Sequence, residues 1–183
     1  MIHDLAYDSV VPATMDEDEE LKRQLEILQF LPEEALDIPV DLQNDVVWAV
    51  ASNELRKINS YRTPGEKIGC IVACSALITR FLGAAKLKAG EGGDPGADEF
   101  LPLFIWVVLK AKCPFLYRNT EYISIFHHPT RLMGMSGYCL MNLRSALEFL
   151  RELKTADNIS MDKAEFSRLY DAAADRIDAI SDQ

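Results

Sequence analysis

Positive charge is scarce in this chain of 183 residues. Its 19 lysines and arginines stand against 29 aspartates and glutamates, which gives a net charge of −10 and a pI near 4.8. Nucleic-acid binding needs a basic stripe that displaces counterions, and docking on an anionic membrane leaflet needs positive charge as well. We therefore expect no nucleic-acid partner and no unaided binding to an anionic membrane.

Signals for export and for membrane insertion are also missing. The first 20 residues are acidic and lack the basic segment and apolar core of a signal peptide. The longest apolar run, residues 100–109, is about half as long as a membrane span. The four cysteines stand inside apolar runs, where a free thiol behaves as a small core residue, as is usual in a reducing compartment. These observations predict a cytoplasmic protein that does not insert into the membrane.

Motifs for covalent chemistry are missing too. The sequence has no glycine-rich phosphate loop, no dinucleotide fingerprint and no paired catalytic acids. A zinc site built from Cys70, Cys74, His127 and His128 would use adjacent histidines, which are poor co-ligands. A cysteine–histidine nucleophile would lack a third residue to orient the base. We expect neither a metal nor a cofactor.

What the sequence does contain is helical periodicity. Few segments alternate with period two, so the chain is predicted to be all-α. Residues 1–17 show no clear period and read as a loosely held arm, followed by a short amphipathic helix with a leucine stripe. We divide the chain into an acidic arm and helix at 1–40 and a helical domain at 41–183. The leucines of the stripe are Leu21, Leu25, Leu28 and Leu31.

The later helices are predicted from caps, breaks and apolar faces. Thr63-Pro64-Gly65-Glu66 has the pattern of a capping box with proline at the first helical position. Residues 90–96 read as a mobile glycine-rich loop. The other predicted helices cover 40–58, near 99–112, 118–126 and 138–153, with a last one capped by Ser160. The side chains predicted to face inward are Val46, Val47, Val50 and Leu55 in the first of these, and Phe166, Leu169, Ala173 and Ile177 in the last.

Asp98 stands where the glycine-rich loop meets the most apolar helix. An acidic residue at such a junction is usually a cap or a first-turn charge favoured by the helix dipole. If Pro102 occupies the first helical position, Asp98 stands free ahead of the helix. If Asp98 is the cap, Pro102 still lies in the first turn. The spacing does not decide between these two arrangements.

Several apolar residues near Asp98 have two readings. Pro102, Ile105 and Leu109 follow Asp98 at helical spacing, and either pack in the core or line a binding surface; for Leu109 we favour the core. Tyr138 is either a buried aromatic with a satisfied hydroxyl or an interface anchor. The residues alone leave these readings open.

A set of motifs occurs in one order along the chain, between about residues 45 and 153. It includes Thr63-Pro64 with Lys67, the run Ala97-Asp98-Glu99-Phe100-Leu101-Pro102, and Gly137-Tyr138 with Asn142-Leu143. In this order the motifs resemble the Vps-nine domain family, exchange factors for Rab-five-type small GTPases. The resemblance implies a compact, layered set of about six helices that binds the switch regions of such a GTPase.

The resemblance also implies roles for particular residues. Asp98 matches the aspartate that displaces the nucleotide. Pro102 matches a proline at the binding groove and Tyr138 a tyrosine that contacts the switches; we add Ile105 and Met141 to this GTPase-binding set. Met141 replaces a threonine found in many members, Met135 replaces a glutamate, and Cys139 replaces the second residue of an aromatic pair.

A free carboxylate is chemically sufficient for this task. Small GTPases hold GDP through backbone amides, a lysine and Mg²⁺, all of which favour negative phosphates. Two like charges about 4 Å apart, at an effective dielectric constant of about 20, interact by roughly 4 kcal/mol. Since about 1.4 kcal/mol is a factor of ten in rate, one aspartate can speed nucleotide release by about a thousandfold.

We therefore expect a guanine-nucleotide exchange factor that promotes GDP release from an early-endosomal Rab-five-type GTPase, in its GDP-bound or nucleotide-free form. The protein would be a monomer, since no heptad seam persists, and would reach endosomes through partners. The alternative is a non-catalytic helical module that binds a GTPase or serves as a scaffold. A third class, a metal-dependent hydrolase, would require bound zinc.

Overall fold

The computed structural model describes residues 2–90 and 92–181, and the regular elements in these ranges are all helical. The prediction of an all-α fold with about six helices behind an N-terminal arm is confirmed, because six α-helices follow the arm formed by the first two. The α-helices are α1 (Ile2–Asp8), α2 (Val11–Ile27), α3 (Asp45–Arg56), α4 (Pro64–Lys88), α5 (Ala97–Ala111), α6 (Leu116–Phe126), α7 (Met135–Glu152) and α8 (Lys163–Ser181).

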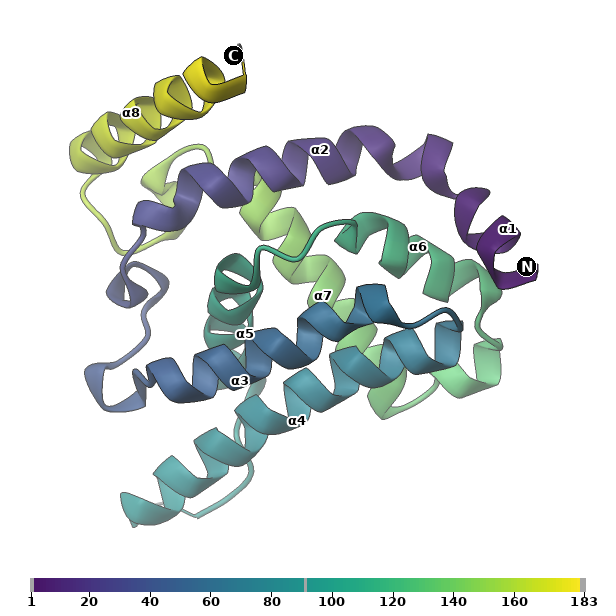
Figure 1. Cartoon of the computed structure of the whole chain (residues 1–183). Coiled ribbons are helices and arrows are strands. Elements are labelled where there is room, and N and C mark those ends of the chain that lie inside the picture. The colour runs from purple at the N-terminus through teal and green to yellow at the C-terminus, as the bar shows by residue number, and fades with distance from the viewer. Residues whose placement is uncertain (1, 91, 182–183) are drawn as a thin grey trace.

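The helices pack in layers around one core. α3 and α4 lie side by side, and α5 and α7 pack against them (Figure 1). α2 runs across the opposite side of the molecule, where it contacts α6, α7 and α8. A single cluster of buried apolar side chains reaches from Leu21 to Phe166. Residues on both sides of position 40 therefore share this core.

The N-terminal arm is more regular than its sequence indicates. We predicted a loosely held segment over residues 1–17, of which Met1 lies outside the described residues. The prediction is wrong for the rest, because α1 and α2 make this segment helical and bury Val10 and Thr14. The face of α2 that packs inward carries polar residues as well as leucines, including Asp18, so apolar periodicity fails to reveal its first half. The leucine stripe from Leu21 onward is buried as predicted.

The inward face of α3 also differs from the prediction. Val46 and Val50 were expected to point inward, but they are 74% and 46% exposed. The buried stripe is instead Trp48, Ala51, Ser52 and Leu55. Trp48 decides the rotation of the helix, because burying its large ring removes more apolar area from water than burying a valine. Leu55 is buried as predicted, and Val47 is partly buried.

The start of α4 has the predicted capping box. The Thr63 hydroxyl accepts the Glu66 amide, and the Glu66 carboxylate accepts the Thr63 amide, both at 3.2 Å. In the described part of the chain, α4 is the one continuous helix long and apolar enough to cross a membrane. Its apolar residues pack against α3, α5, α6 and α7, as those of a core helix do.

Several other helix ends lie a few residues from their predicted positions, since the helix predicted at 40–58 covers Asp45–Arg56 and the helix predicted at 118–126 begins at Leu116. α8 is capped by Asp162, whose Oδ1 accepts the Glu165 amide at 2.9 Å, whereas Ser160 donates to Asp37. α7 begins at Met135, three residues before Tyr138, and α5 begins at Ala97. On α8, Phe166 and Ala173 are buried as predicted, while Leu169 and Ile177 are partly exposed. The predicted loop at 90–96 separates α4 from α5, and Glu91 within it lies outside the described residues.

Candidate functional site

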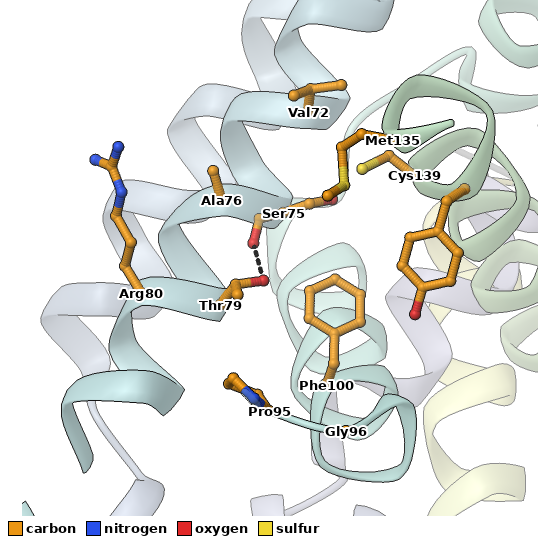
Figure 2. A pocket seen from close by; sticks show the side chains of 11 residues that line it. Val72, Ser75, Ala76, Thr79, Arg80, Pro95, Gly96, Phe100, Met135 and Cys139 are labelled. Atoms are coloured by element: carbon orange, nitrogen blue, oxygen red, sulfur yellow. Dashed lines mark hydrogen bonds between the residues drawn. The ribbon is translucent and has the colours of Figure 1, made fainter. Parts of the chain in front are cut away.

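A groove of about 390 Å³ lies where α4 passes the starts of α5 and α7. Its walls are largely apolar, and Figure 2 shows Phe100 of α5 facing Met135 and Cys139 of α7 across the space, with Arg80 directed away from it. A concave, mostly apolar surface with a few polar groups is the usual form of a binding site. The lining residues are Val72, Ser75, Ala76, Thr79, Arg80, Pro95, Gly96, Phe100, Met135, Tyr138 and Cys139.

Asp98 lies between Gly96 and Phe100, two residues that line this groove. It is the second residue of α5, and Gly96 is the cap, so both arrangements considered from the sequence are wrong about Pro102. Pro102 is the sixth residue of α5, counted from Ala97, and lies inside the helix. Asp98 is exposed, and among the described residues its carboxylate has no hydrogen bond or ion pair. This first-turn aspartate is therefore available to a partner.

Pro102 weakens the turn that carries Asp98. In an α-helix the amide of residue 102 would donate to the carbonyl of residue 98, but proline has no amide hydrogen and its ring crowds that carbonyl. The side chain of Pro102 is itself partly exposed. The first turn of α5 is consequently held with fewer backbone bonds than an ordinary helix start.

Glu99 supplies part of the missing support. Its Oε2 accepts the Gly96 amide at 2.8 Å, which is the half of a capping box that a glycine cap allows. Lys86 Nζ lies 3.1 and 2.9 Å from the two carboxylate oxygens. The Lys86 bond, and then the Gly96 amide, hold the pKa of Glu99 below its usual value. Sequence reasoning missed the role of both residues, although a glutamate three places after a glycine cap is a recognisable signal.

The start of α7 presents apolar side chains beside the groove. Tyr138 is 47% exposed and Met141 is 66% exposed. Met133 and Met135 are 74% and 68% exposed. Several large apolar residues exposed together are typical of an interaction surface. The exposure of Tyr138 excludes the reading of a buried aromatic.

Gly137 sets how closely the start of α7 approaches the turn before it. A Cβ at this position would lie 1.8 Å from the backbone oxygen of Leu132. No side chain fits there, so the turn η5 (Pro129–Leu132) can pack against α7 only because residue 137 is glycine. This packing fixes the neighbouring Tyr138.

Ile105 contributes less to the surface than predicted. It is only 7% exposed, and Leu109 is completely buried, as the core reading of Leu109 required. Asp98, Tyr138 and Met141 are exposed and Pro102 is partly exposed on α5 and α7, two helices that pack against each other, whereas Ile105 is nearly buried. A direct contact of Ile105 with a partner stays a prediction, limited to its small exposed edge.

The sequence matches a known protein family over more than half of its length. Residues 48–155 match the family described as the Vacuolar sorting protein 9 (VPS9) domain. The chain belongs to the VPS9 domain family. The matched range agrees with the extent of the resemblance read from the motifs, and it contains α4, α5 and α7, which build the groove.

Several curated relatives of this VPS9 domain protein are similar over most of its length. The Vacuolar protein sorting-associated protein 9A of Arabidopsis thaliana is 38% identical over 91% of this chain and 32% of its own length. The protein of the same name from Oryza sativa subsp. japonica is 37% identical over 93% of this chain and 35% of its own length. The Rab5 GDP/GTP exchange factor of Homo sapiens is 31% identical over 86% of this chain and 32% of its own length. The chain thus spans about a third of the length of these relatives.

The floor of the groove in this VPS9 domain carries two small polar side chains. Cys139 is 1% exposed, and burial raises the pKa of its thiol, which makes it a poor nucleophile at neutral pH. The hydroxyl of Ser75 is buried beside this thiol and opposes part of the rise in the pKa of Cys139. Within residues 2–90 and 92–181, no three histidine, cysteine or acidic side chains lie close enough together to hold a metal ion.

Proposed function

We propose that this chain is a guanine-nucleotide exchange factor for a Rab-five-type small GTPase of early endosomes and acts in endocytic vesicle traffic. The observation that carries the proposal is the carboxylate of Asp98, which is exposed, has no partner among the described residues and belongs to the same helical turn as Gly96 and Phe100 of the apolar groove. Membership of the VPS9 domain family supports it, as does the name of the human relative, Rab5 GDP/GTP exchange factor.

Binding and nucleotide release fall to different residues in this proposal. The exposed apolar side chains of Pro102, Tyr138 and Met141 contact the switch regions, with Ile105 supporting them from below. Burying an exposed aromatic residue in such an interface contributes much of the binding free energy, because it removes a large apolar area from water. These contacts place Asp98 next to the nucleotide site.

Asp98 then promotes release of the nucleotide by electrostatic repulsion. Its negative charge repels the phosphates of GDP, competes for the lysine that binds them and disfavours the bound Mg²⁺. The GTPase is left nucleotide-free until a new nucleotide enters. No covalent bond forms or breaks, so the reaction requires no cofactor of the exchange factor.

The lack of a hydrogen-bond or ion-pair partner for Asp98 in the described part of the chain suits this mechanism. A carboxylate that was already paired would have to break its bond before it could act, and that cost would reduce its effect on the phosphates. Its exposure leaves the charge ready to approach the phosphates. We propose further that the chain acts as a monomer in the cytoplasm and is recruited to early endosomes by partners.

The test is release of fluorescent GDP from a panel of endosomal Rab GTPases, with wild type, Asp98→Ala and Tyr138→Ala compared. We expect wild type to accelerate release in proportion to its concentration and Asp98→Ala to lose about a thousandfold of the maximal rate. Tyr138→Ala should raise the half-saturating concentration about tenfold and spare the maximal rate, because it removes a binding contact.

A binding assay on the same proteins distinguishes an exchange factor from a non-catalytic GTPase-binding module. If wild type and Asp98→Ala bind a GTPase equally and neither accelerates release, the chain is a non-catalytic GTPase-binding module. If wild type neither binds nor exchanges any member of the panel, the proposed partner class is wrong.

A further inference from the structure

One carboxylate joins the start of α5 to the end of α4. Glu99 accepts the amide of Gly96 at 2.8 Å and also binds Lys86 in the last turn of α4, at 3.1 and 2.9 Å. Within the described part of the chain, no other side-chain hydrogen bond or ion pair reaches residues 96–99. The polar attachment of this turn to its surroundings therefore runs through Glu99.

The turn that carries Asp98 has little else to hold it. It follows a glycine-rich segment in which Gly90 and Gly93 have φ angles of 76° and 107°, values that few other residues adopt. The cap residue, Gly96, has no side chain that could bind the first amides of the helix. Pro102 offers no amide to the Asp98 carbonyl.

We infer that Lys86 and Glu99 are positioning residues for Asp98. By holding the first turn of α5 against α4, the pair fixes the direction in which the Asp98 carboxylate projects. This inference rests on the proposed exchange function. Lys86 and Glu99 act through Asp98 and need not touch the GTPase.

Two further properties suit the pair to this role. The Lys86 side chain is 19% exposed and that of Glu99 is 40% exposed, so solvent screens their attraction less than that of a fully exposed pair. A reacting group must also be placed closely, since a shift of about 1 Å can cost on the order of a hundredfold in rate. A modest loosening of this turn is therefore enough to reduce exchange.

The experiment compares maximal rate and half-saturating concentration of GDP release for Lys86→Met, Lys86→Arg and wild type. We expect Lys86→Met to lower the maximal rate about tenfold and to change the half-saturating concentration by less than about twofold. Lys86→Arg keeps the positive charge and should retain most of the wild-type rate. A purely structural role would not produce this separation of rate from affinity.

Two controls isolate the effect. Lys112→Met breaks the Lys112–Glu26 pair, also 2.9 Å long, just beyond the other end of α5, and should leave exchange unchanged. Lys86→Met added to Asp98→Ala should cause no further loss, because the pair acts only through Asp98. An additional loss in the double variant would overturn the inference.

Hydrogen–deuterium exchange gives a readout that does not depend on any GTPase. The amide of Gly96, which Glu99 accepts, and that of Phe100, which donates to the Gly96 carbonyl at 3.1 Å, should exchange with deuterium faster in Lys86→Met than in wild type. Equal amide protection in the two proteins would overturn the inference. So would a wild-type rate of GDP release in Lys86→Met when Asp98→Ala is inactive. Failure of the wild-type protein to accelerate GDP release from a GTPase would instead overturn the proposed function. The amide measurement would then decide whether Lys86 and Glu99 hold the first turn of α5.

Discussion

Asp18 and Asp98 each stand at the N-terminal end of a helix, Asp18 reaching the start of α6 from the middle of α2 and Asp98 lying in the first turn of α5, yet their surroundings are opposite. Asp18, on α2, is 5% exposed and accepts the backbone amides of Tyr117 and Arg118 at the start of α6, at 2.9 and 3.3 Å. The guanidinium of Arg118 lies 3.8 Å from the same carboxylate. Asp98, on α5 itself, is exposed and has no partner among the described residues.

The difference shows how one side-chain type serves two purposes. The oxygens of Asp18 are occupied by amides that would otherwise be buried without a partner, so this carboxylate supports the fold. Burial raises the pKa of Asp18, and the two amide bonds and Arg118 oppose that shift. The oxygens of Asp98 are left for a ligand outside the chain. The role of each carboxylate thus depends on whether the fold provides its oxygens with hydrogen-bond partners.

The largest effect on stability is expected when Asp18 is removed. Asp18→Ala leaves two amides of α6 unpaired and Arg118 without its counter-charge, which should lower the free energy of unfolding by about 3 kcal/mol. Asp98→Ala should change it by less than about 0.5 kcal/mol. Urea unfolding of the two variants measures both values. Equal losses would show that Asp98 also supports the fold and would remove the contrast between the two residues.

A smaller effect, of opposite sign, is expected at the start of α5. Pro102→Ala supplies an amide for the Asp98 carbonyl and removes the crowding of the ring, which should raise the free energy of unfolding by about 1 kcal/mol. Pro12→Ala is the matched control, because Pro12 is the second residue of α2, where the amide has no helical partner in any case. Urea unfolding again provides the measurement. A loss of stability in Pro102→Ala would mean that packing of the ring outweighs the missing bond.

The smallest effect is expected at Met141. Met141→Thr restores the residue that the resemblance leads us to expect, on a side chain that is 66% exposed, and should change stability by less than about 0.5 kcal/mol. One additional hydrogen bond to a GTPase would lower the half-saturating concentration about threefold to tenfold. GDP-release titrations of the two proteins test this. An unchanged half-saturating concentration would show that position 141 lies outside the surface that contacts the GTPase.

Local signals in the sequence predicted some elements well. The capping box at Thr63 and Glu66 is present as expected, because it depends only on residues three apart. The helices and the loop between α4 and α5 follow from periodicity and glycine. The match to the VPS9 domain family agrees with the order of motifs, and Asp98, Pro102 and Tyr138 were singled out through them.

Predictions failed where the answer depended on contacts between distant segments. The rotation of α3 followed from where Trp48 is buried, and valines at neighbouring positions gave no warning of it. Asp18 was hidden in an acidic run, because its partners lie about a hundred residues away on α6. The pairing of Lys86 with Glu99 likewise joins two helices across a glycine-rich loop.

By itself, the sequence determined the helical class, the family and the identity of the residue proposed to release nucleotide. Helix formation is governed by interactions within a few residues, and these are written directly in the chain. The tertiary structure decided which charges are satisfied and which are free. Asp18 and Asp98 have the same carboxylate, but burial and hydrogen bonding occupy the first, whereas the second is exposed.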